Sequence, residues 1–180
     1  MPVVAGNWVA WWDLTSVRYS KVVEKNIKTG KRVVFKQRAP GIVGPPGVGG
    51  GRIYWFKDSG ADGDGVLRRA PLGRRRYRAI AGPGGPGAPT WFGAGGLPPV
   101  PSANRLHVAY TDETNLLDPS TPAGVGDGRD VFLARPGGSA TPKPVTRNRG
   151  DQAYPVMGWG NRVLWLDAAR GHTDLVTNLP

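Results

Sequence analysis

Cysteine is absent from the chain, and histidine occurs only as His107 and His172. Without cysteine the protein has no disulfide bond, no thiolate metal ligand and no cysteine nucleophile. We expect His107 within a strand and His172 in a turn. Neither lies in a pattern that joins a histidine to a carboxylate and a hydroxyl for nucleophilic catalysis. The sequence therefore predicts no catalytic residue, no metal site and no cofactor, and we expect a protein that is not an enzyme.

Long apolar runs are also missing. No apolar stretch approaches the roughly 18 residues that a membrane-spanning helix needs, so we do not expect a transmembrane protein. The first residues, Met1–Gly6, have neither a basic segment nor a cleavage pattern, and we expect no secretory leader in this chain. No segment shows apolar residues at the 3.6-residue period of an amphipathic helix. These absences favour an all-β fold.

Glycine and proline are abundant, with 28 and 18 residues in a chain of 180. They gather between short apolar runs, as the turns of an all-β protein require. Seven tryptophans argue against disorder, because each offers a large apolar area to bury. We predict that residues 1–180 form a single β-domain with long loops.

One short pattern recurs along the chain. Gly160–Asp167 and Gly6–Asp13 are identical at their Gly, Asn, Val, Trp and Asp positions, and weaker copies occupy Gly50–Asp58 and Asn104–Asp112. Spacings of 44, 53 and 57 residues separate the apolar anchors Val9, Ile53, Leu106 and Val163. A repeat of about this length is typical of propeller blades or solenoid units.

Each repeat is predicted to form a four-stranded antiparallel meander. The fold class is therefore all-β, as a β-propeller or partial propeller of about four blades, the last of them incomplete. We place the blades at about residues 2–38, 41–81, 88–147 and 152–180. In the second blade we expect the fourth strand over residues 74–80. In the third we expect the innermost strand around Trp91 and Phe92.

The repeated residues are interpreted as structural. Alternation along the fourth copy puts Val163 and Trp165 on one face and Leu164 and Leu166 on the other, and we expect both faces to be buried between blades. The closing Asp is expected to accept backbone N–H bonds in the next turn. In the third copy Val108 stands where Trp is expected. We assign structural roles to Trp11, Asp13, Trp55, Asp58, Asp112, Trp165, Asp167 and Asp174.

The fourth copy resembles the TolB-type, WD-like β-propeller repeats of extracytoplasmic bacterial proteins. The resemblance is carried by Pro155–Asp167, followed by Arg170-Gly171 and Thr173–Leu175, and Pro2–Asp13 fits nearly as well. It implies a scaffold, a binding module of the cell envelope or surface, or the non-catalytic part of a peptidase. It also implies a periplasmic, cell-surface or secreted location, which the sequence does not itself establish. An incomplete last blade further suggests self-association through the open seam.

Positive charge is concentrated in the first hundred residues. They carry 16 Lys and Arg against 5 Asp and Glu, whereas the remaining 80 carry eight of each. Such asymmetry favours a protein or an anionic polymer as the binding partner. The alternative is that the charges only prevent the sheet edges from pairing with other strands. Nucleic acid is less expected, because few aromatic residues interleave with the charges. The candidate binding cations are Lys28, Lys31, Arg32, Arg68, Arg69, Arg74, Arg75, Arg76 and Arg78.

Two other functions remain open, and one further motif is interpreted as structural. Exposed tryptophans, Trp91 or Trp159, would suit carbohydrate binding, and the chain could be the propeller portion of a larger hydrolase. Asp58–Asp64 is similar to a calcium-binding loop, but Arg69 occupies the position where a bidentate Glu is needed. We therefore expect a solvated hairpin loop there.

Overall fold

The computed structural model describes residues 2–16, 18–39, 41–58, 65–81, 100–112, 129–137, 141–147, 150–168 and 173–178. Within these ranges the secondary structure consists of strands, with no helix. In particular, the described part of the chain has no helix long and apolar enough to cross a membrane. The all-β prediction is confirmed.

Sheet 1 is a four-stranded antiparallel meander in the order β1-β2-β3-β4. Its strands are β1 (Val3–Ala5), β2 (Trp8–Ser16), β3 (Tyr19–Asn26) and β4 (Arg32–Arg38). The β3–β4 hairpin turns at Gly30, whose φ is +70°. The Asn26 carboxamide oxygen accepts bonds from the amides of Lys28 and Thr29 at 3.0 Å. This local bonding explains the tight turn predicted at residues 28–31.

Sheet 2 has a divided inner strand. Its strands are β5 (Ile42–Val43), β6 (Gly47–Gly49), β7 (Arg52–Asp58), β8 (Gly65–Pro71) and β9 (Arg78–Ala81). Both β5 and β6 pair with β7, and Pro45-Pro46 separates them, since proline has no amide hydrogen to donate. The predicted fourth strand over 74–80 is corrected to β9, because the chain turns at Gly73 (φ +76°) and pairs again only from Arg78.

Sheets 3 and 4 complete the row. Sheet 3 contains β10 (Ser102–Ala103), β11 (Val108–Asp112), β12 (Asp130–Ala134) and β13 (Lys143–Pro144), and sheet 4 contains β14 (Gln152–Met157), β15 (Val163–Asp167) and β16 (Asp174–Thr177). The innermost strand of sheet 3 is thus β10, and the strand predicted around Trp91 and Phe92 falls outside the described residues. Sheet 4 has three strands among the described residues, in agreement with the prediction of an incomplete last blade.

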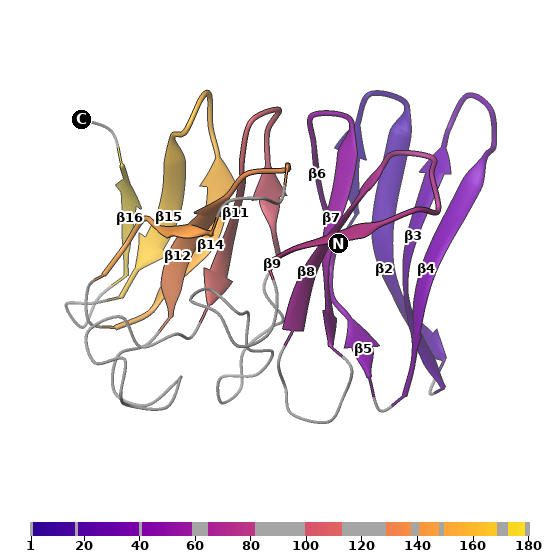
Figure 1. Cartoon of the computed structure of the whole chain (residues 1–180), viewed down its shortest axis with the longest axis horizontal. Coiled ribbons are helices and arrows are strands. Elements are labelled where there is room, and N and C mark those ends of the chain that lie inside the picture. Colours follow the sequence, from indigo (N-terminus) through magenta and orange to yellow (C-terminus); the bar gives the residue numbers. More distant parts are fainter. Residues whose placement is uncertain are drawn as a thin grey trace.

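The four sheets stand side by side in chain order, with sheets 1 and 4 at opposite ends of an unclosed row (Figure 1). Three apolar cores fill the spaces between successive sheets. We call the face of a sheet that contacts the preceding sheet its leading face, and the face that contacts the following sheet its trailing face. On leading faces lie the pairs Ile53 and Trp55, Val108 and Tyr110, and Val163 and Trp165. This arrangement is a partial propeller, as predicted.

The face assignment corrects two sequence-based interpretations. Tyr110, not Val108, occupies the Trp position of the third repeat, because Tyr110 lies on the leading face two residues before Asp112. Leu164 and Leu166 are not buried: they are 37% and 36% exposed, since no described sheet covers the trailing face of sheet 4. Their apolar character therefore has no packing partner within the described chain.

Candidate functional site

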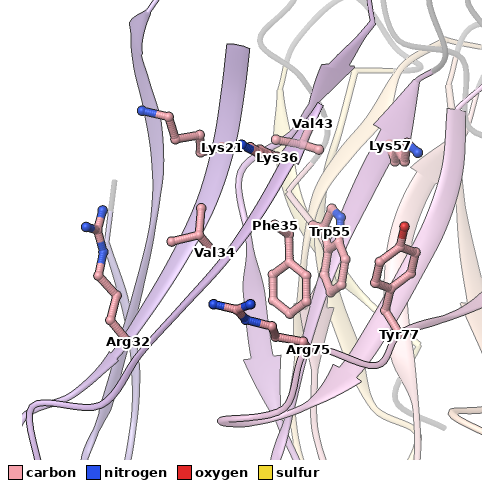
Figure 2. Close-up of a pocket in the computed structure, with 10 residues that line it drawn as sticks. All are labelled: Lys21, Arg32, Val34, Phe35, Lys36, Val43, Trp55, Lys57, Arg75 and Tyr77. Carbon is pink, nitrogen blue, oxygen red and sulfur yellow. The ribbon is translucent and has the colours of Figure 1, made fainter. Parts of the chain in front are cut away.

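A hollow of about 600 Å³ opens along β4, the outer strand of sheet 1, and its lining includes residues from both faces of this strand (Figure 2). Its floor is aromatic. Phe35 of β4 stacks on Trp55 of β7 with ring centroids 4.2 Å apart, and the Tyr77 ring meets Trp55 edge-on at 5.6 Å. Phe35 and Trp55 are buried, whereas Tyr77 is 45% exposed. The buried rings hold the floor rigidly, and Tyr77 offers an exposed aromatic surface to a ligand.

Five cationic side chains line the hollow, and its lining contains no carboxylate. They come from four different segments: Lys21, Arg32, Lys36, Lys57 and Arg75. Arg32 and Lys36 alternate with the buried residues of β4, and Lys21 pairs with Lys36, so these three lie on the other face of sheet 1 from the aromatic floor (Figure 2). The Lys21 ammonium lies 3.4 Å from Asp13, and the Lys36 ammonium lies 5.2 Å from the centroid of the Tyr19 ring. Among the described residues, no carboxylate lies within ion-pairing distance of the other three cations. Most of the positive charge is therefore available to an anion.

A second hollow of about 610 Å³ adjoins the first. Its lining is Arg69, Pro71, Arg75, Arg76, Tyr77 and Arg78. Burial, and then the charge of Arg52, lowers the pKa of Arg69 from its usual value. The Arg68 guanidinium lies 5.5 Å from the centroid of the Tyr77 ring. Because Arg75 and Tyr77 line both hollows, the two form one surface, which we call the cationic strip.

Glu24 of sheet 1 anchors the segment that carries Arg75 and Tyr77. A Glu24 carboxylate oxygen accepts a 2.9 Å bond from the Gly73 amide. Gly73 has a φ of +76°, and a Cβ there would stand 2.7 Å from the Trp8 ring, so glycine is required. Glu24 is fully buried, and burial raises its pKa to about 7. The shape of the cationic strip thus depends on one buried carboxyl group.

The structure gathers only part of the predicted cationic set. Arg32, Arg69, Arg75, Arg76 and Arg78 line the two hollows, whereas Lys28, Lys31, Arg68 and Arg74 line neither. Lys28 and Lys31 are exposed at the β3–β4 hairpin. Three lining cations were not predicted: Lys21, Lys36 and Lys57. Lys21 and Lys36 are register partners on adjacent strands, a signal that strand pairing alone could have revealed.

The candidate carbohydrate-binding tryptophans and the calcium-like loop, which we expect to be a solvated hairpin, have little described structure. Trp159 is 90% exposed in the turn between β14 and β15, and Trp91 lies outside the described residues. Residues 59–64 of the calcium-like loop also lie outside them. Within the described part of the chain, no group of three or more metal-ligating side chains occurs.

His107 does not assemble a catalytic group among the described residues. Its Nδ1 lies 3.4 Å from the backbone oxygen of Gly160, between sheets 3 and 4. The 620 Å³ hollow that it lines also contains Arg135 and Lys143, with no carboxylate in the lining. His172 lies outside the described residues.

The repeated Asp residues differ in what they contact. Asp13 accepts bonds from the hydroxyl and the amide of Thr15 at 2.6 and 3.0 Å, and these bonds lower the pKa of Asp13 to about 2. Asp167 accepts a 3.4 Å bond from the Gln152 side chain and pairs in register with Asp174. The side chains of Asp58 and Asp112 lie outside the described part of the structure.

The repeated Trp residues fall in two environments. Trp55 and Trp165 are buried, at 1% and 6% exposure, on the leading faces of sheets 2 and 4. Trp11 is half-buried, and it lies on the leading face of sheet 1, which no described sheet precedes. The Trp repeat therefore marks one face of each of these sheets.

The comparisons with known proteins bear on the fold. No protein-family model and no curated protein matches the sequence. The structure is similar to the crystal structure of TolB from Acinetobacter baumannii, with a TM-score of 0.61, 11% identity and 95% of this chain covered. It also matches a prolyl endopeptidase structure over the whole chain, with a TM-score of 0.46 and 12% identity. This chain spans 38% of that TolB and 34% of that endopeptidase, and the TolB likeness confirms the β-propeller fold.

Proposed function

We propose that this chain is a non-catalytic binding module that holds an anionic polymer along the cationic strip. The observation that supports the proposal is the pair of adjoining hollows that share Arg75 and Tyr77 and have no carboxylate in their linings. Cations that serve only to keep a sheet edge from pairing need no common concave surface. Here eight cationic side chains line two adjoining hollows that share Arg75 and Tyr77.

The chemistry of the strip favours a chain of anionic groups over a single small anion. Arginine forms paired hydrogen bonds with phosphate, sulfate or carboxylate groups, whereas lysine acts as a compact point charge. The cations that line the first hollow are three lysines and two arginines, and those that line the second are all arginines. A ligand that fills both must therefore present negative charge repeatedly along its length.

Charge reversal at the shared residue is the direct test. We expect Arg75→Glu to weaken the binding of fluorescently labelled polyphosphate by at least tenfold, because it removes a charge-assisted contact of roughly 1.5–3 kcal/mol and adds a repulsive charge. Anisotropy titrations at several salt concentrations should also show a smaller salt dependence for the variant. A titration with labelled heparin distinguishes phosphate from sulfate preference.

Arg147→Glu is the matched control, because it makes the same change in net charge at an exposed residue that lines neither hollow. We expect it to weaken binding less than threefold. Equal losses in the two variants would show that only overall charge matters and would reject the strip as the site. Carbohydrate binding stays a prediction, supported among the described residues by the exposed Trp159. The alternative that the chain is the propeller portion of a larger hydrolase also stays a prediction.

A further inference from the structure

The three contacts between sheets follow one rule. In each, the leading face of the later sheet packs on the trailing face of the earlier one. Ile53 and Trp55 pack with Ala10 and Val22 of sheet 1. In the same way, Val108 and Tyr110 pack with Tyr54 and Phe56, and Val163 and Trp165 pack with Ala109 and Val131. The rule leaves two faces without a described sheet against them: the leading face of sheet 1 and the trailing face of sheet 4.

The leading face of sheet 1 has an apolar centre and charged margins. Strand register places Trp11, Val23 and Val34 in one row across β2, β3 and β4. The row on one side runs from Val4 and Val9, which are apolar, to Lys25 and Arg32, which are charged and exposed. The row on the other side contains Asp13, Lys21 and Lys36. An apolar centre with a polar rim is the usual anatomy of a protein interface.

The trailing face of sheet 4 is apolar over two neighbouring rows. Val156 and Leu164 are register partners, and so are Leu166 and Leu175. All four are exposed, from 36% for Leu166 to 70% for Leu175. Four neighbouring exposed aliphatic side chains form a patch of the kind that marks an interaction site.

We propose that the trailing face of sheet 4 binds the leading face of sheet 1 in a second copy of this chain, so that two copies close a ring of eight sheets. Within the chain, a trailing face packs against a leading face three times. The proposed seam joins the same two kinds of face, so it would continue this mode of packing. Eight blades lies within the usual range for propellers. Two-fold symmetry makes both seams identical and leaves neither end face open. Lys21, Arg32 and Lys36 lie on the leading face of sheet 1 and also line the first hollow. Arg32 and Lys36 are on β4, the outer strand of sheet 1, and Lys25 is exposed, so all three can keep their charged ends in water at the rim of the seam.

Light scattering after size-exclusion chromatography tests the proposal. We expect a dimer of about 38 kDa, twice the chain mass of 19.2 kDa, that dissociates on dilution. A tail variant, Leu166→Lys with Leu175→Lys, and a head variant, Val4→Lys with Val9→Lys, should each be monomeric at the same concentration. Each introduces lysine where the seam is apolar, and Leu166, Leu175 and Val4 are already exposed, so folding should persist by circular dichroism.

Mixing the two variants distinguishes association through the proposed seam from nonspecific hydrophobic association. The tail variant keeps an intact leading face and the head variant an intact trailing face, so an equimolar mixture should form a dimer through one seam, at least tenfold weaker than the unmodified dimer. Leu106→Lys is the matched control, because Leu106 is 57% exposed but lies on neither end face, and it should leave the dimer intact. A monomer up to about 0.5 mM, an open series of oligomers, or a dimer insensitive to both variants would overturn the proposal.

Discussion

Replacing Gly47 with alanine is expected to lower the free energy of unfolding by about 2–4 kcal/mol. Gly47 lies in β6, and a Cβ on it would overlap the backbone carbonyl oxygen of Pro101, next to β10. The obstacle is backbone, which cannot rotate away as a side chain can. The inner strands of sheets 2 and 3 would have to separate, and packing throughout the core between these sheets would loosen.

Chemical denaturation followed by tryptophan fluorescence measures this loss. Gly49→Ala should behave similarly, because its Cβ would overlap the backbone oxygen of Ala103. Gly137→Ala is the control: nothing lies within 4 Å of a Cβ there and its φ is not in the left-handed region, so its effect should stay within about 0.5 kcal/mol. If Gly47→Ala unfolds at the same denaturant concentration as the parent, the inner strands are not packed as closely as the structure shows.

The repeat pattern predicted the sheets, and it failed where the repeat itself is degenerate. The two strong copies, Gly6–Asp13 and Gly160–Asp167, together with the weaker copies at Gly50–Asp58 and Asn104–Asp112, predicted the meanders and their number. In the third copy, the apolar Leu106 was taken as the anchor, but the strand starts at Val108. Leu106 lies before this strand, where its backbone amide donates a hydrogen bond to the side-chain oxygen of Asn104. The predicted alignment of the third copy was therefore shifted by two residues, and Tyr110 was not recognised as the residue at the Trp position.

The candidate site was predictable as a charge cluster but not as a surface. Local sequence placed Arg74, Arg75, Arg76 and Arg78 together, yet it could not show that Arg74 lines neither hollow while Lys57 lines one. Lys57 lies in β7 and Arg75 in the segment between β8 and β9, and they line the same hollow because the chain turns back at Gly73, whose amide bonds to Glu24 of sheet 1. The burial of Glu24 could not be predicted either, because a glutamate near lysines in a strand is expected to be exposed to solvent.

The buried Glu24 should make the protein less stable as the pH rises from about 4.5 to 7. The folded state raises the pKa of Glu24 from 4.5 to about 7, chiefly through burial. Between these two values the folded chain binds a proton that the unfolded chain has lost, so the free energy of unfolding falls with increasing pH. By this linkage the full difference amounts to roughly 3 kcal/mol, reached above pH 7.

Glu24→Gln isolates this contribution, because glutamine retains an oxygen that can accept the Gly73 amide and has no charge to bury. We expect the variant and the parent to be equally stable near pH 4.5, and the variant to be more stable by roughly 3 kcal/mol at pH 8.5. Denaturation of both proteins across this range gives the difference directly, and contributions from His107 and His172 cancel in the comparison. Glu24→Ala, which leaves the Gly73 amide without its acceptor, should lose part of this gain. A difference between parent and Glu24→Gln that does not vary with pH would mean that the carboxyl group is hydrated, and the link between sheet 1 and the cationic strip would then be a solvent-exposed hydrogen bond.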